Sequence, residues 1–116
     1  MIRRHKEQTA TVNENMRGGN GSVRIEALLT AEELYNKGRI FSRVIVKPGC
    51  SIGYHMHENE MESYVIISGS GVYDDNGNEI TVNAGDVTLT TSGQGHGIVN
   101  NGDADLIMIA LILHKG

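Results

Sequence analysis

The sequence predicts an all-β protein, an antiparallel sandwich or barrel built from short strands. Its 116 residues include 15 glycines but only one proline and no tryptophan, a composition that suits short strands joined by tight turns. Stretches rich in β-forming residues are separated by turn residues at regular intervals. An Asn-Gly pair at residues 76–77 lies between two such stretches. This pair is a strong hairpin signal because both central residues of the turn need positive φ.

The N-terminal segment differs from the rest of the chain. Residues 1–21 are polar, bear several glycines and show no sustained helical or strand period. We expect them to form an arm that is either flexible or ordered by a partner subunit. A first strand follows over residues 23–29, and we expect residues 22–116 to fold as a single domain.

One short helix is predicted next. Thr30 and Glu33 have the spacing of a capping box, and Gly38 provides a C-terminal stop. All later stretches are typical of strands, bounded by turn residues that include a second Asn-Gly pair at residues 101–102. We expect strands over residues 39–47, 51–57, 62–68, 71–74, 78–82, 86–91, 96–100 and 106–113. The last of these is almost continuously apolar, so we expect it to be buried on both sides.

Composition limits the functions to consider. The net charge of -4 and the lack of a basic patch argue against a nucleic-acid partner. No apolar run reaches transmembrane length, which argues against a membrane protein. Cys50 is the only cysteine, so no intrachain disulfide can form, and we expect a cytoplasmic protein in which this residue only fills space.

Four candidate metal ligands lie in two separate segments. His55 and His57 are two residues apart on a predicted strand, so both side chains should project to one side. Glu62 follows five residues after His57, and His96 lies in a second, glycine-rich segment. A His-x-His pair alone would also fit an exposed strand, but the joint pattern favours a metal site.

Three imidazoles and one carboxylate would give an N3O ligand set. Imidazole suits Zn, Fe, Ni and Cu, whereas a carboxylate with open octahedral positions suits Mn and Fe. We therefore expect one divalent metal per chain, namely Mn, Fe, Zn or Ni, with Mn or Fe favoured. Four protein ligands leave one or two positions open, where a substrate carboxylate, a hydroxyl or dioxygen could bind.

These ligand candidates lie within two longer motifs. The first has the spacing Gly, five residues, His-x-His, four residues, Glu, six residues, Gly, and it is formed by Gly49, His55, His57, Glu62 and Gly69. The second is formed by Gly85, Gly93, His96 and Asn100, with Thr91 at a position that usually holds proline. Over roughly residues 40–113 the chain resembles the cupin family in both motifs.

The resemblance implies a double-stranded β-helix, or jelly-roll barrel, with the metal inside its mouth. By motif position, His55, His57, Glu62 and His96 would be the metal ligands, and Asn100 would be structural. More narrowly, the chain is similar to small single-domain bacterial cupins labelled oxalate decarboxylase-like. This implies a lyase or dioxygenase that acts on a small carboxylate or hydroxy acid.

Two other functions remain open. One is a sugar or sugar-phosphate isomerase of the same fold, and the other is a non-catalytic module that binds a small ligand. The sequence does not choose among these reactions or substrates. Because a small β domain has exposed sheet edges, we also expect a C2 homodimer in which residues 23–29 add to a neighbour's sheet.

Several side chains near the motifs could contact a substrate. Tyr64 could face the interior with Glu62, either as a substrate contact or as part of the core. Arg43 is the one cation in an apolar strand and could either bind an anionic substrate or reach the surface. Glu58 and Glu60 fit solvated loop charges better than a supporting role at the metal.

Overall fold

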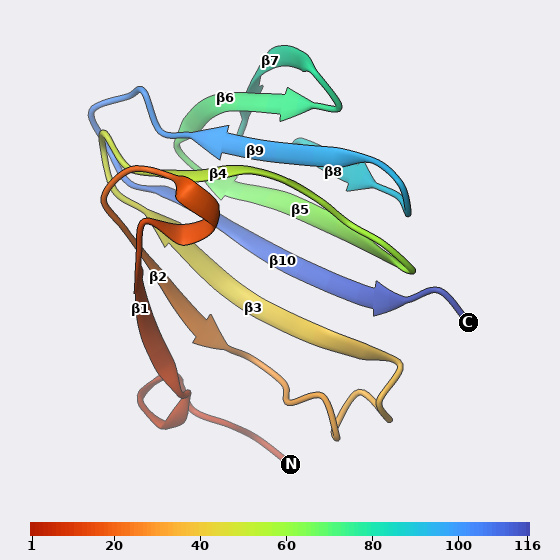
Figure 1. Cartoon of the computed structure of the whole chain (residues 1–116). Helices are drawn as coiled ribbons and strands as arrows, with labels where there is room; N and C mark the ends of the chain where they lie inside the picture. Colours follow the sequence, from red (N-terminus) through yellow and green to blue (C-terminus); the bar gives the residue numbers. More distant parts are fainter.

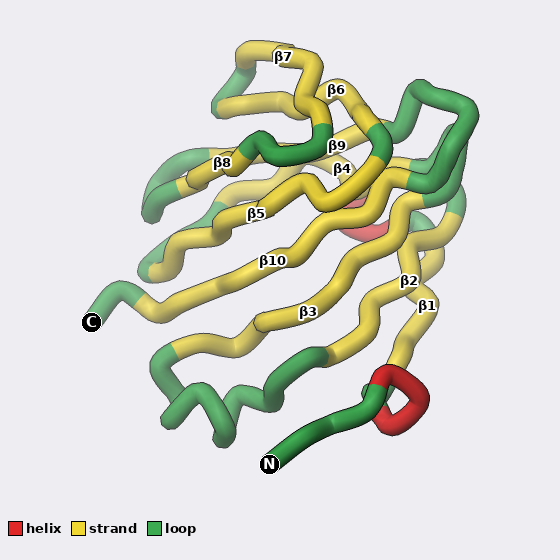
Figure 2. Tube along the Cα trace, turned by 180° about the vertical axis from the view of Figure 1, so that it is seen from behind, coloured by secondary structure: helices red, strands yellow, loops and turns green.

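Two antiparallel β-sheets face each other in the computed structural model of the chain, which describes residues 1–116 (Figure 1). The larger sheet has the order β1 (Ala10–Glu14), β2 (Ser22–Ala27), β3 (Gly38–Val46), β10 (Leu106–His114), β5 (Glu60–Ser68), β8 (Val87–Thr90). The smaller sheet has the order β4 (Ser51–Met56), β9 (Gly95–Val99), β6 (Ser70–Asp75), β7 (Asn78–Asn83). Figure 2 shows the larger sheet from behind, with its strands in this order.

The strand predictions are confirmed, because each predicted stretch overlaps one of the strands from β2 to β10. The hairpin at residues 76–77 is also confirmed. Asn76 and Gly77 have φ values of 50° and 99°, and they join β6 to β7 where Asp75 pairs with Asn78. The second Asn-Gly pair forms no hairpin, because β9 and β10 belong to different sheets.

The predicted helix over residues 30–37 does not form. The capping box itself is present, since the Thr30 amide donates to Glu33 at 2.9 Å and the Glu33 amide donates to the Thr30 hydroxyl at 3.1 Å. Tyr35 and Asn36 both have φ of 55°, in the left-handed region, so the chain turns back after a single turn. The only helices are two 3-10 turns, η1 (His5–Glu7) and η2 (Met16–Gly18). Neither has the length or apolar character needed to cross a membrane.

The N-terminal segment is part of the larger sheet. β1 pairs with β2 over five residue pairs from Ala10↔Glu26 to Glu14↔Ser22. The arm was expected to be either flexible or ordered by a partner subunit, but the chain's own sheet orders it. β2 is in turn paired with β3. With both edges of β2 occupied, residues 23–29 cannot add to a neighbour's sheet as predicted.

The hydrophobic core lies between the sheets and follows the two-residue period of each strand. Val44, Tyr64 and Met108 reach it from the larger sheet, and Ile52 and Ile98 reach it from the smaller one. Burying each such side chain contributes about 1.5–3 kcal/mol to the free energy of folding. β10 was expected to be buried on both faces, but along this strand fully buried residues alternate with half-buried ones.

One polar side chain is buried where the two sheets approach each other. The Asn100 side-chain amide donates to the carbonyls of Val46 and Ala104, both at 2.8 Å, and its oxygen accepts from the Gly102 amide at 3.0 Å. Asn100 is fully buried, so no water can replace these partners. The side chain therefore fixes the turn between β9 and β10 against the end of β3.

We predict that Asn100→Ala destabilises the fold by roughly 2–4 kcal/mol, because it removes one buried hydrogen bond to Val46 and two part-buried ones to Ala104 and Gly102. Urea unfolding monitored by circular dichroism measures this loss. Asn101→Ala is the matched control, since Asn101 is exposed and should change the free energy of unfolding by less than about 0.5 kcal/mol. Equal stability of the two variants would contradict the structural role of Asn100.

Candidate metal centre

Two of the candidate ligands come from the end of β4. His55 and His57 point into the barrel, as the two-residue period predicts. Tyr54, which precedes them, and Met56, which lies between them, are half-exposed on the outer face. His57 is only 2% exposed. The strand register also places His55 directly opposite His96 of β9, so three histidines meet within one sheet.

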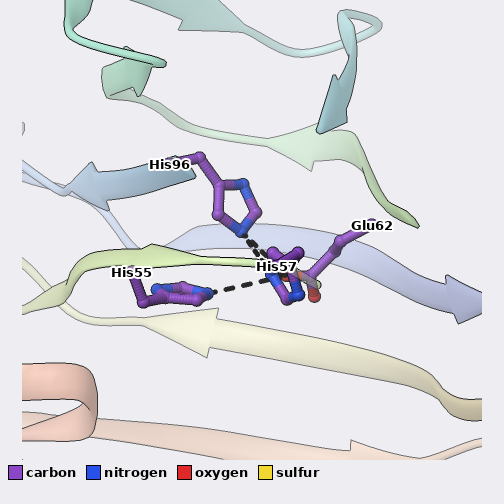
Figure 3. A group of neighbouring side chains, drawn as sticks. All are labelled: His55, His57, Glu62 and His96. Carbon is purple, nitrogen blue, oxygen red and sulfur yellow. Dashed lines mark hydrogen bonds and ion pairs between the residues drawn. The ribbon is translucent and has the colours of Figure 1, made fainter. Parts of the chain in front are cut away.

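Glu62 brings the fourth ligand from the opposite sheet, on β5. Its Oε1 atom lies 2.9 Å from Nε2 of both His57 and His96, and 3.9 Å from Nε2 of His55. One ligand atom from each of the four residues lies within 4.8 Å of the others. Figure 3 shows the three rings and the carboxylate pointing toward one centre. The structure thus brings together all four residues singled out in the sequence.

The other nitrogen of each imidazole is held by a separate partner. Nδ1 of His55 lies 2.8 Å from the Gly53 carbonyl. Nδ1 of His57 lies 2.8 Å from the Glu60 carboxylate, and Nδ1 of His96 lies 2.8 Å from the Tyr73 hydroxyl. A carbonyl and a carboxylate can only accept, so His55 and His57 donate from Nδ1 and turn Nε2 toward the cluster. Such outer partners orient the ligands of metal sites.

This arrangement lacks a positive charge at its centre. Burial raises the pKa of Glu62, but hydrogen bonds and charge from the surrounding imidazoles outweigh this effect and lower the pKa to about 2. The carboxylate is therefore ionised. Burial lowers the pKa of His96, although Glu62 opposes the shift, so the neutral ring is favoured. Nε2 of His57 and Nε2 of His96 lie only 3.1 Å apart, facing the carboxylate. Imidazole nitrogens and a carboxylate at this spacing fit a divalent cation.

A small cavity of about 70 Å³ opens beside the cluster. Tyr64 lines it, as the sequence predicts for an inward position, and its ring stacks on His96 with a centroid distance of 5.0 Å. Burial raises the pKa of Tyr64 well above its usual value, so the hydroxyl stays protonated. Ile40, Val44 and other apolar side chains form much of the remaining wall.

Arg43 does not reach this cavity. It lies on the opposite face of β3 from the cavity-lining Ile40 and Val44, and its guanidinium pairs with Glu26 at 3.1 Å. The second possibility raised for this residue, a place on the outer surface, matches the structure. The predicted substrate contact through Arg43 therefore has no support.

Two other arginines line the cavity instead. Arg39 comes from β3, and Arg17 comes from η2, in the segment that was expected to lie outside the domain. The two-residue period places Arg39 with Arg43 on the outer face, so the sequence pattern gave no signal for it. The register of β3 with β10 shifts between Gly38 and Ile40, which is where Arg39 lies. Nothing local to Arg17 reveals its position, which depends on the contact between η2 and β4.

The start of β5 also holds a residue whose role at the site was not predicted from the sequence. Glu58 is exposed, as expected for a solvated loop charge, but Glu60 is 14% exposed and accepts from His57 Nδ1. Arg39 binds the same carboxylate with two hydrogen bonds of 2.8 and 2.9 Å. The Arg39 charge lowers the pKa of Glu60 to about 2, despite its partial burial, so Glu60 stays an acceptor at neutral pH.

Comparison with known proteins agrees with this geometry. Residues 42–112 match the family model described as the cupin domain. The chain belongs to the cupin family. The two facing antiparallel sheets are the cupin jelly roll, as the sequence resemblance implied.

Individual relatives extend the match beyond these residues. An oxalate-binding protein of Thermotoga maritima is 45% identical over 113 residues, which cover 97% of this chain and 93% of the relative. A crystal structure of a predicted oxalate decarboxylase from Thermotoga maritima has a TM-score of 0.94 and 45% identity, and the match covers 98% of this chain and 99% of that one. A Klebsiella pneumoniae protein with a double-stranded β-helix domain has a TM-score of 0.69 and 25% identity, covering 79% of this cupin and 76% of that chain.

We predict that Glu60→Ala weakens metal binding by about 10- to 100-fold, because His57 loses the acceptor that fixes its tautomer. Competition with a metal-sensitive chelating dye measures the affinity. Glu58→Ala removes the same charge from the same loop and should leave the affinity unchanged. A similar loss in both variants would mean that Glu60 acts only through loop charge.

Proposed function

We propose that this cupin is a metal-dependent protein that binds small dicarboxylates, with oxalate as the first candidate. The convergence of three imidazole Nε2 atoms on Glu62 Oε1 carries the proposal. The relative that is 45% identical over nearly the whole chain is an oxalate-binding protein, which supports this choice of ligand. The cavity of about 70 Å³ also favours a ligand of very few atoms over a drug-sized one.

The roles of the residues follow from their positions. His55, His57, Glu62 and His96 would hold one divalent metal, for which Mn or Fe is our first choice. When bound, that metal would supply positive charge to attract and polarise a carboxylate. Tyr64 keeps its proton and can donate a hydrogen bond to the ligand from the cavity wall. The apolar part of the wall excludes water and so strengthens these polar contacts.

Decarboxylation of oxalate to formate and carbon dioxide is a second candidate function. The crystal structure of a predicted oxalate decarboxylase, with a TM-score of 0.94, favours it. Incubating the metal-loaded protein with ¹³C-labelled oxalate and following formate by NMR separates turnover from binding. A sugar-phosphate isomerase is less well supported, because the two sugar phosphate isomerases among the similar solved structures are only 19% and 21% identical and show the fold alone.

We predict that the manganese-loaded protein binds oxalate and that His55→Ala/His96→Ala does not, because the double variant loses two of the four ligands. Elemental analysis should give about one metal per chain in the wild type and almost none in the variant. Calorimetry then reports oxalate binding. His5→Ala/His114→Ala removes two exposed imidazoles and is the matched control. Full metal occupancy in His55→Ala/His96→Ala would contradict the assignment of these residues as metal ligands.

We also propose a cytoplasmic location. Cys50 has no partner within the chain and packs half-buried against the core. An unpaired thiol of this kind suits a reducing compartment.

The outer face of the larger sheet supports the proposal of a homodimer. Ile109 of β10 pairs with Val65 of β5, which pairs with Val87 of β8, so apolar side chains run across neighbouring strands. Val65 is 36% exposed, Val87 is 66% exposed and Leu89 is 55% exposed. A contiguous apolar face of this kind marks an interaction site. A second copy would cover it and complete the burial that the almost continuously apolar β10 predicts.

We predict a dimer mass by light scattering at tens of micromolar, and a monomer mass for Val65→Glu, which places a charge in the middle of this face. Ile80→Glu is the control, because Ile80 is 51% exposed on β7 of the other sheet. A monomeric wild type, or a dimer that survives Val65→Glu, would rule out this interface.

A further inference from the structure

The cavity beside the metal cluster has two cationic side chains in its wall, and only one of them is engaged. Arg39 uses its guanidinium in two hydrogen bonds to Glu60, so that side chain is already satisfied. Arg17 also lines the cavity but forms no side-chain hydrogen bond and no ion pair with the rest of the chain. The guanidinium fork of Arg17 is therefore available to an anion that enters the cavity.

The chain places Arg17 there through a close contact between η2 and β4. A side chain at Gly53 would collide with the carbonyl oxygen of Arg17, and a side chain at Gly19 would collide with the carbonyl oxygen of Ser51. Both glycines are thus needed for η2 to lie against the strand that carries His55. The contact fixes the backbone of Arg17 against the strand that carries His55.

The backbone around Arg17 is strained. Asn15 and Arg17 have φ values of 50° and 55°, although neither is glycine. The contact between η2 and β4 holds this backbone in place.

We propose that Arg17 determines the preference of the cavity for dicarboxylates, by binding the second carboxylate of a ligand whose first carboxylate is held at the metal cluster. The inference rests on the proposed function and adds the residue that sets its specificity. A fork of paired N–H donors matches a carboxylate geometrically, which a single ammonium cannot do. Arg17 lies outside the 42–112 match to the cupin domain, so this specificity would come from the N-terminal segment.

Calorimetry on the manganese-loaded protein tests the role of Arg17, with oxalate and acetate as the two probes. In Arg17→Gln we expect oxalate affinity to fall about 10- to 100-fold, the usual effect of losing a charged hydrogen bond, and acetate affinity to change less than about twofold. Arg17→Lys should show an intermediate loss, because it keeps the charge but not the fork. Metal content should stay at about one per chain in every variant.

Arg4→Gln is the matched control, because Arg4 is an exposed arginine of the same N-terminal segment that does not line the cavity. An equal loss of oxalate affinity in Arg4→Gln would show a general charge effect and overturn the role of Arg17. So would a wild-type preference for oxalate that survives Arg17→Gln, although the proposed function would then stand. If the wild type binds neither probe, the proposed function fails and this inference falls with it.

Discussion

The site depends on one electrostatic constraint: three imidazole nitrogens meet a buried carboxylate that forms no ion pair with an arginine or lysine. Glu62 is ionised, and its Oε1 atom lies 2.9 Å from both His57 and His96. Burying a carboxylate is costly unless a cation or hydrogen bonds compensate it. The two sheets that meet here hold Glu62 on one side and the histidines on the other, so the fold brings these groups together, and the proposed divalent cation would balance the carboxylate charge.

Much of this arrangement could be predicted from the sequence, because it follows from short-range regularities. The two-residue period sends His55 and His57 to one side, and the Asn76-Gly77 turn fixes the hairpin of β6 and β7. Spacing alone does not show that Glu62 and His96 converge with them. That prediction came from the resemblance to cupins. The structure agrees with it, because one ligand atom from each of the four residues lies within 4.8 Å of the others.

The features that were missed depend on long-range contacts. The capping box of Thr30 and Glu33 forms as predicted, yet Tyr35 and Asn36 end the turn before a helix can develop. β1 carries little strand pattern of its own and is defined by its pairing with β2. Arg43 points outward to a buried Glu26, a partner from another strand. Arg17, Arg39 and Glu60 likewise acquire their positions only when distant segments pack together.

The crystal structure of the protein as purified, with anomalous diffraction data collected across the absorption edge of its metal, tests the central claim most directly. The claim predicts one anomalous peak per chain at the centre of the four ligand atoms, with Nε2 of His55, His57 and His96 and a Glu62 oxygen directed toward it. It would be contradicted by the absence of any peak in protein supplied with manganese and iron during expression. A peak elsewhere in the chain, with the imidazoles and Glu62 bonded only to one another, would contradict it equally.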